Sequence, residues 1–220
     1  MRGRNRCHLD PDLNADVRPR MPGWRAAFGQ DKIAQRHLQK QGVGRGDLFL
    51  FFGWFRKVEP GKGGTWRYVS SAPNVHRLFG WLQVSEVVPI GTLTHARSER
   101  PWLAEHPHLN RRWENNTVYI AREALNISGL TAGSGAGHFG GDGERLTLTA
   151  PRSANRSKWR PPSWFYPPGG RPVLSYHYDT KLWKRREPWA YVTTVGRGQE
   201  FVIDVDGIPE AESWLRELSV

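Results

Sequence analysis

Two stretches decide the fold of this chain: GDLFLFFGWFR at residues 46–56 and LFGWLQVSEVV at residues 78–88. The tripeptide Phe-Gly-Trp stands in both, at 52–54 and 79–81. Each stretch is an apolar run of strand length, rich in aromatic and β-branched residues. A glycine inside a strand marks a bulge or a close approach to the backbone. We therefore predict two central strands whose rings form the core, the floor of a slot, or both, with one of Trp54 and Trp81 facing inward and the other facing the slot.

Further strands are predicted at 66–70, 117–121, 146–149, 189–195 and 200–205, with a loop at 57–65. A helix is expected after Asp31, a good N-cap, and before Gly42, a good C-cap. A second, amphipathic helix is expected at 209–219. Strands dominate without regular strand–helix alternation, which favours an α+β fold with a mostly antiparallel, partly barrel-like sheet and a few short helices.

The composition points to a polyanionic partner. The chain has 220 residues, 32 Lys and Arg against 21 Asp and Glu, a formal charge of +11 and 11 Trp. This length fits a single domain over 1–220, with an irregular segment at 1–30. Such a basic balance favours DNA or another nucleic acid, or an acidic membrane surface. Cys7 is the single cysteine, and no signal peptide or apolar span is visible, so we expect a cytoplasmic protein with no membrane partner.

The segment 151–190 concentrates positive charge among aromatic residues and prolines. Cations neutralise phosphates and rings stack on unpaired bases, so this segment is the best candidate for nucleic-acid contact. The alternative is a solvated basic face over a packed core. The candidate nucleic-acid-binding residues, here and elsewhere, are Trp54, Arg56, Trp81, Arg111, Arg112, Lys158, Trp159, Arg160, Lys184, Arg185 and Arg186.

Three short patterns could carry chemistry. His8, Asp10 and Asp12 alternate in HLDPD, so their side chains could share a divalent metal. The histidines of HPH at 106 and 108 could act as acid–base groups, as could the two carboxylates at 200 and 204. The candidate catalytic residues are His106, His108, Glu200 and Asp204. The alternative for all of them is a surface or capping role.

The glycine-rich stretch 129–143 contains GAGHFG at 135–140, which matches the pattern GxGxxG. A dinucleotide-binding loop must leave a strand and open a helix. Here a strand-like segment follows, so we interpret the match as accidental and expect a loop or lid with His138 and Phe139 at its tip.

Ordered segments along nearly the whole chain resemble the third nucleotide-modification-associated domain family. They include CHLDPDL (7–13), the two Phe-Gly-Trp stretches, HPH (106–108), SKWRPPSWF (157–165) and GQEFVID (198–204). The resemblance implies a role near base modification in bacteria and their phages. It also implies an N-terminal stretch with a strand ahead of CHLDPDL. Its loss, from a shortened product or a start assigned too late, would expose a sheet edge and remove part of a site.

The order of the first helix, a Gly-Asp strand and a strand ending in VSEV is also similar to the start of a PUA-like or EVE-like domain. Those small barrels can hold a flipped modified base. The sequence thus favours a protein that reads or helps process modified bases. The alternatives are a metal-assisted or acid–base enzyme acting on nucleotides or DNA bases, and a structural partner in a larger complex.

Overall fold

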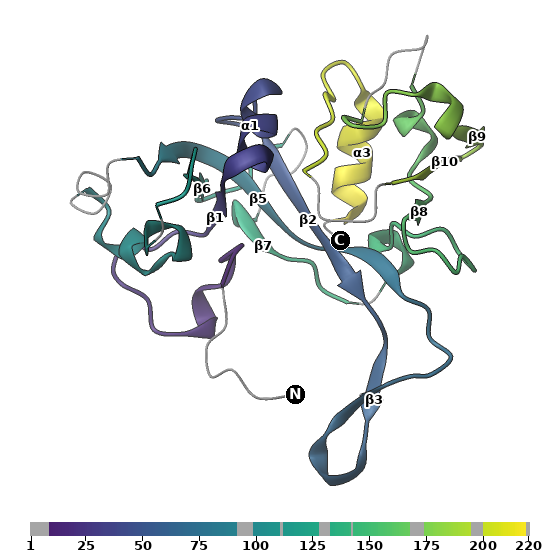
Figure 1. Ribbon diagram of the computed structural model, residues 1–220, viewed down its shortest axis with the longest axis horizontal. Coiled ribbons are helices and arrows are strands. Elements are labelled where there is room, and N and C mark those ends of the chain that lie inside the picture. The colour runs from purple at the N-terminus through teal and green to yellow at the C-terminus, as the bar shows by residue number, and fades with distance from the viewer. Residues whose placement is uncertain are drawn as a thin grey trace. The chain divides into compact units, whose positions relative to one another are not determined.

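The computed structural model describes residues 9–91, 99–110, 112–127, 133–141, 143–167, 174–194 and 200–218. Within these ranges the fold is α+β, as the sequence predicts, with helices α1 (Lys32–Lys40) and α3 (Pro209–Leu218) (Figure 1). The strands are β1 (Ala27–Gln30), β2 (Leu48–Phe55), β3 (Val58–Pro60), β4 (Trp66–Tyr68), β5 (Val75–Pro89), β6 (Thr117–Ala121), β7 (Ala136–His138), β8 (Lys158–Trp159), β9 (Lys184–Arg186) and β10 (Trp189–Thr193). No helix in this part of the chain is long and apolar enough to cross a membrane.

The largest sheet has the order β1-β6-β5-β2, and β7 pairs with β5 beside this path. The pairs β1–β6, β5–β6 and β5–β7 are antiparallel. The two Phe-Gly-Trp stretches therefore lie on neighbouring strands of one sheet, which confirms that part of the prediction. A three-stranded sheet, β8-β10-β9, and the hairpin β3–β4 complete the strand pairing. The partly barrel-like, PUA-like closure stays a prediction.

The chain forms two compact units, and their boundaries fall within β2 and β5. Unit 1 comprises the chain up to Leu50 and Gly80–His138, and unit 2 comprises Phe51–Phe79 and the chain from Phe139 onward. The repeated tripeptide is thus divided between the units, since 52–54 lies in unit 2 and Gly80 and Trp81 lie in unit 1. That the two units make one domain over 1–220 stays a prediction.

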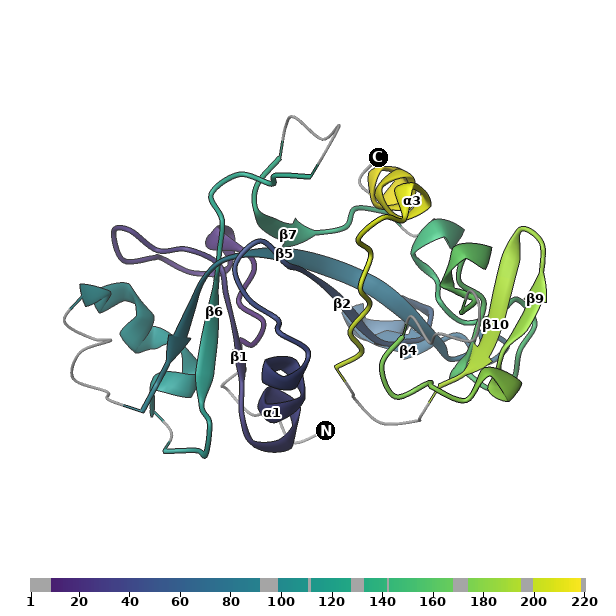
Figure 2. The same cartoon turned by 90° about the horizontal axis from the view of Figure 1, so that it is seen from above.

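Unit 1 is built around β6, whose five residues are all buried. On one face, the rings of Phe28, Phe49 and Tyr119 pack together with centroids 5.0–6.3 Å apart. The phenol of Tyr119 donates a hydrogen bond to Gln35 of α1 (3.0 Å), and Figure 2 shows α1 beside β1 and β6. On the other face, Val118 and other apolar side chains pack against two short 3-10 helices, Pro101–Glu105 and Pro107–Asn110.

Unit 2 has an aromatic core. The rings of Phe52, His76, Trp159 and Phe201 pack edge-to-face or stacked, with centroids 5.1–6.1 Å apart where they meet. The indole Nε1 of Trp159 donates to His76 Nδ1 (3.0 Å). Such pairs add to the stability gained from burial alone. In α3, Trp214 packs edge-on against Trp164 and Phe165, which fixes the helix to the segment before it.

Of the two glycines in the Phe-Gly-Trp stretches, Gly80 marks a close approach to the backbone, as predicted. A Cβ on Gly80 would lie 2.7 Å from the carbonyl oxygen of Gly137 and 2.6 Å from Leu13, so only glycine lets β7 and the N-terminal segment pack here. A Cβ on Gly137 would lie 2.8 Å from the indole of Trp81. Residues 136–138 therefore form a strand and not the tip of a loop, which corrects the lid prediction for His138.

Two predicted strands are wrong. Residues 146–149 make only isolated bridges, Arg77 with Thr147 and Thr149 with Trp159, and 200–205 makes a single bridge through Ile203. The segment 146–149 begins on the last residue of a 3-10 turn, Glu144–Leu146. Its alternating pattern therefore reflects burial without a continuous partner strand. The predicted loop 57–65 instead contains β3. Both predicted helices are present, α1 beginning after Asp31 and ending just before Gly42 (φ +74°).

Candidate functional site

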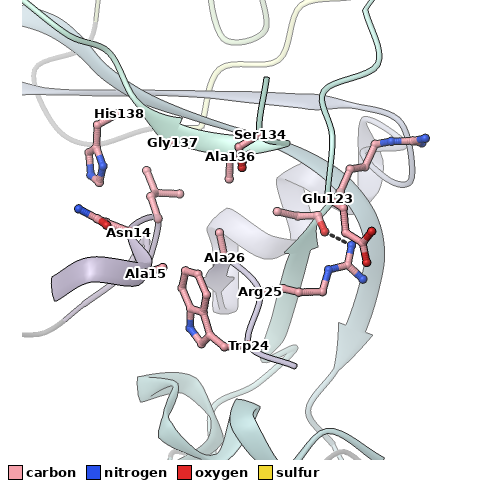
Figure 3. Close-up of a pocket in the computed structure, with 13 residues that line it drawn as sticks. Asn14, Ala15, Trp24, Arg25, Ala26, Glu123, Ser134, Ala136, Gly137 and His138 are labelled. Atoms are coloured by element: carbon pink, nitrogen blue, oxygen red, sulfur yellow. Dashed lines mark hydrogen bonds between the residues drawn. The ribbon is translucent and has the colours of Figure 1, made fainter. Parts of the chain in front are cut away.

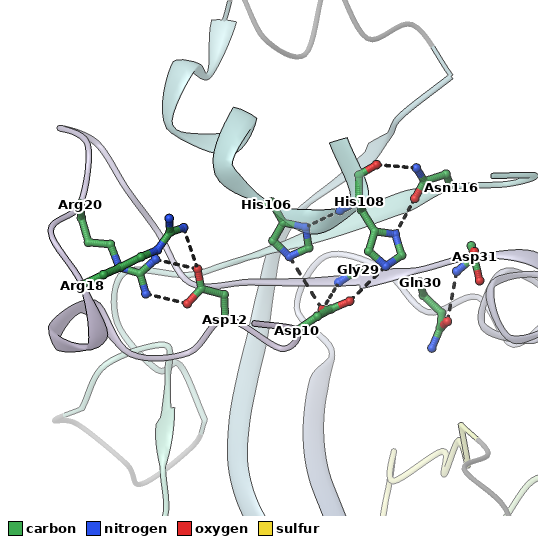
Figure 4. A network of polar contacts seen from close by, with 10 residues as sticks. All are labelled: Asp10, Asp12, Arg18, Arg20, Gly29, Gln30, Asp31, His106, His108 and Asn116. Atoms are coloured by element: carbon green, nitrogen blue, oxygen red, sulfur yellow. Dashed lines mark hydrogen bonds and ion pairs between the residues drawn. The ribbon is translucent and has the colours of Figure 1, made fainter. Parts of the chain in front are cut away.

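A buried polar cluster joins the N-terminal segment of unit 1 to its sheet (Figure 4). The carboxylate of Asp10 accepts a hydrogen bond from the backbone N–H of Gly29 in β1 (2.9 Å). Its other oxygen lies 3.0 Å from Nε2 of His108, and the Nε2 of His106 is 3.8 Å from Asp10. The side chains of Asp10, His106 and His108 are only 7%, 3% and 6% exposed. The structure therefore brings together two of the predicted catalytic residues and one predicted metal ligand.

The protonation of His108 follows from its partners. The amide nitrogen of Asn116 donates to the backbone carbonyl of His108 (2.8 Å), so the amide oxygen of Asn116 faces His108 Nδ1 (2.5 Å) and accepts from it. Nε2 then donates to Asp10. Burial disfavours the charged ring, but the hydrogen bonds that the ring donates to Asp10 and Asn116, together with the carboxylate charge, outweigh it and raise the pKa of His108. The contact with Asp10 therefore favours the imidazolium form of His108.

His106 behaves oppositely. Burial lowers its pKa to about 4 despite the attraction of Asp10, so its ring is neutral at pH 7. Its Nδ1 accepts from the backbone N–H of His108 (3.3 Å), and its Nε2 has no hydrogen-bond partner among the described residues. Adjacent imidazoles with pKa values pushed apart are the kind of pair that can divide acid and base roles. The catalytic role of both stays a prediction.

Asp12 lies in a second ion cluster. Its two oxygens accept from the guanidinium of Arg20 at 2.6 and 2.7 Å. Arg18 reaches Glu105 (3.2 Å) next to this pair. His8 lies outside the described residues, and within those residues no group of three or more ligating side chains could hold a metal ion. Both oxygens of Asp12 are bound by Arg20, and the shared divalent metal stays a prediction.

Unit 1 also contains a cavity of about 550 Å³ (Figure 3). Its wall is formed by the chain that precedes β1, by the residues at the end of β6 and just after it, and by β7. Trp24 supplies an aromatic side, and the charged or polar lining residues include Arg25, Arg122, Glu123 and His138. Arg25 is held by Ser85 Oγ (2.8 Å) and the carbonyl of Ala121, and its buried Nε has no partner among the described residues. The cavity thus combines one large ring with cations and one carboxylate.

The cavity wall is connected to the ion cluster. The guanidinium of Arg20, which binds Asp12, lies over the ring of Trp24 at 4.2 Å from its centroid. Neither His106 nor His108 lines the cavity. The histidine cluster therefore lies outside the cavity lining.

In unit 2, predicted nucleic-acid-binding residues lie on an aromatic surface. Trp54 is 63% exposed, its Nε1 donates to Asn74 (2.9 Å), and the guanidinium of Arg156 lies 4.3 Å from its ring centroid. Arg160 lies in the same way over Trp189 (4.3 Å) and also pairs with Glu144 (2.8 Å). These stacked pairs hold both rings and cations in fixed positions.

The neighbouring strands present more cations. Lys158 of β8 is exposed, and all three residues of β9, Lys184, Arg185 and Arg186, are exposed. Trp159 is 5% exposed and belongs to the aromatic core, so its ring is not available to stack on a base. The alternative of a packed core thus holds for Trp159, and also for Phe165 and Trp183 of the same segment, whereas Lys158 lies on the surface.

The other candidates are dispersed. Arg56 donates to the carbonyls of Val69 (3.1 Å) and Ser70 (3.0 Å). Arg112 is exposed, and Arg111 lies outside the described residues. Trp81 is half-buried, packs on Gly137 of β7 and donates to the carbonyl of Ser134 (3.1 Å), so the prediction that it faces inward stays a prediction.

The two predicted carboxylates belong to unit 2. Asp204 is exposed and accepts from the backbone N–H of Asp206 (3.0 Å), as a turn residue does. Glu200 is half-buried. Burial of the Tyr176 phenol and, after it, the negative charge of Glu200 raise the pKa of Tyr176. Sequence reasoning missed the cavity residues Trp24 and Arg25, because the segment 1–30 shows no periodicity. It also missed the exposed rings of Trp66 and Tyr68, which the strand pattern at 66–70 could have indicated.

Comparison of the sequence with known families matches the model described as nucleotide modification associated domain 3 over residues 1–204. No curated protein matches the chain, and no solved structure matches it.

Proposed function

The chain belongs to the nucleotide modification associated domain 3 family, and from this premise we propose that it binds nucleic acid and reads or helps process modified bases there. Family membership links it to nucleotide modification. Beyond this link, we propose that the chain binds nucleic acid directly, through unit 2.

One observation carries this proposal: the exposed ring of Trp54 with Arg156 stacked on it. A large indole that is 63% exposed and held by Asn74 is already oriented, so little conformational entropy is lost when a base stacks on it. The exposed cations of β8 and β9 supply phosphate contacts in the same unit. An aromatic platform beside cations is how proteins bind unpaired nucleotides.

The test is fluorescence anisotropy of the full chain with labelled oligonucleotides, single-stranded and duplex, with and without a modified base. Replacing Lys184, Arg185 and Arg186 by alanine should weaken binding and reduce the slope of log K against log[salt] by about 0.9 for each duplex phosphate that is no longer neutralised. The matched control removes three exposed positive charges from α1, at Lys32, Arg36 and Lys40. The β9 variant should lose clearly more affinity than the α1 variant.

Two results contradict the proposal. One is a Kd weaker than about 10⁻⁴ M at physiological salt for every oligonucleotide, the lower limit of ordinary non-specific binding. The other is an equal loss in the β9 and α1 variants, which indicates that only net charge matters.

A second candidate is an acid–base enzyme acting on nucleotides or bases, and the cavity of unit 1 favours it. Its volume of about 550 Å³ lies within the range of small-molecule sites. Glu123 and His138 are titratable side chains at its wall, and the two arginines suit an anionic substrate. Nucleoside mass spectrometry of DNA treated with the chain should then show a changed base inventory. Glu123→Gln or His138→Ala should abolish the change while affinity for DNA is retained.

A further inference from the structure

The hairpin β3–β4 of unit 2 has one apolar face that is open to solvent. Its register pairs Val58 with Tyr68 and Pro60 with Trp66. Since alternate residues of a strand point to the same side, these four side chains share one face. The central pair, Glu59 and Arg67, points to the other face and forms an ion pair (2.8 Å).

The exposure of this face is large. Trp66 is 69% exposed, Tyr68 60% and Val58 45%. Single exposed apolar residues are normal, but adjacent exposed rings on one face mark an interaction surface. A two-stranded hairpin gains little stability from such a face in isolation, so its rings are available for a ligand.

Positive charge accompanies the rings. The guanidinium of Arg56 lies 5.6 Å from the ring centroid of Tyr68, and it is anchored by the carbonyls of Val69 and Ser70. Lys57 and Lys62 are exposed on the same hairpin. Glu59 is neutralised by Arg67 on the opposite face. The apolar face is therefore complementary to a ligand that carries both flat apolar groups and negative charge.

We propose that this hairpin is a stacking platform for a single nucleic-acid strand, with unpaired bases on Trp66 and Tyr68 and phosphates near Arg56 and Lys62. The two ring-bearing residues are separated by about 6.8 Å along the strand. Neighbouring exposed rings on one face can each stack on an unpaired base of the same strand. The inference rests on the proposed function and adds to it the kind of strand that is bound.

The test uses the full chain and two labelled probes, an unmodified single-stranded DNA oligonucleotide and the matching duplex. Trp66→Ala and Tyr68→Ala should each weaken single-strand binding about tenfold, with a much smaller effect on the duplex. Trp66→Phe and Tyr68→Phe keep a ring and should restore most of the affinity. Val58→Ala, on the same face without a ring, is the matched control and should leave binding nearly unchanged. Thermal unfolding of each variant shows that the fold is kept.

Three outcomes overturn the inference. If the ring variants bind single strands like the unchanged chain while the β9 variant is still weakened, the hairpin has no role and the proposed function stands. If no probe binds at all, the proposed function fails and the inference with it. If the alanine variants change sedimentation from dimer to monomer with unchanged affinity for DNA, the face is a contact for a second copy of the chain.

Discussion

The Nε2 of His108 lies 3.0 Å from the carboxylate of Asp10 in a pair whose side chains are 6% and 7% exposed. The pair sits between the N-terminal segment, the 3-10 helix Pro107–Asn110 and β1, because Asp10 also accepts from the N–H of Gly29. The pair thereby connects three segments of unit 1 that are separated in the sequence.

Asp10→Asn should therefore destabilise the protein, by about 3–5 kcal/mol at pH 6, because His108 is left as an unpaired buried cation. The pKa of His108 is raised in the folded state. The stability from this pair is thus fully present below pH 6.5 and is lost as pH rises through the raised pKa. Urea unfolding at pH 6 and at pH 9 should show the larger loss at pH 6. Glu114→Gln, which breaks an exposed pair with Arg36, is the control and should cost under about 1 kcal/mol. Equal losses at both pH values would contradict the ion pair.

The two neighbouring histidines should differ in charge. At pH 5.5, ring-nitrogen NMR should find His108 doubly protonated and His106 neutral, since burial lowers the pKa of His106 to about 4. A lowered pKa means that stability from neutral His106 is present above pH 6.5 and is lost as pH falls toward 4. His106→Asn should flatten the stability profile between pH 6.5 and 4. If both rings titrate together near 6.5, the assignment is wrong.

Gly29→Ala should cost about 1–3 kcal/mol, as overpacking does. A Cβ at Gly29 would lie 2.2 Å from the ring of His108, so the imidazole must move away from Asp10. Gly91→Ala has open space around the new methyl group and serves as control. Urea unfolding of the two variants measures the difference, and an unchanged midpoint for Gly29→Ala would show that the ring is not held against β1.

Mutation should distinguish the structural role of Trp159 in unit 2 from the proposed binding role of Trp54. Trp159→Ala empties a buried site that is 5% exposed and should cost about 3–5 kcal/mol. Trp54→Ala removes a ring that is 63% exposed, so it should leave the unfolding free energy nearly unchanged while weakening binding of single-stranded DNA. Thermal unfolding and fluorescence anisotropy of the same two variants test both statements. The opposite pattern would place the core at Trp54.

Local pattern sufficed for elements with a strong periodic or aromatic signal. The strands at 48–55, 75–89 and 117–121 and both helices were predictable, because a run of large apolar residues or a capped amphipathic turn is read from neighbouring positions. The short strands β1, β7 and β9 were not. Each has three or four residues, and they pair with β6, β5 and β10 respectively, so long-range partners decide them.

The sequence alone determined the basic charge, the α+β class and the family of this chain, because these depend on composition and on ordered motifs. It also placed HLDPD and HPH as residues of interest. Only the tertiary structure decided that Asp10 meets His108 while Asp12 meets Arg20, and that Trp54 is open while Trp159 is buried. The reason is physical: side chains at the same local spacing differ in burial and in partner, and both depend on segments distant in the chain.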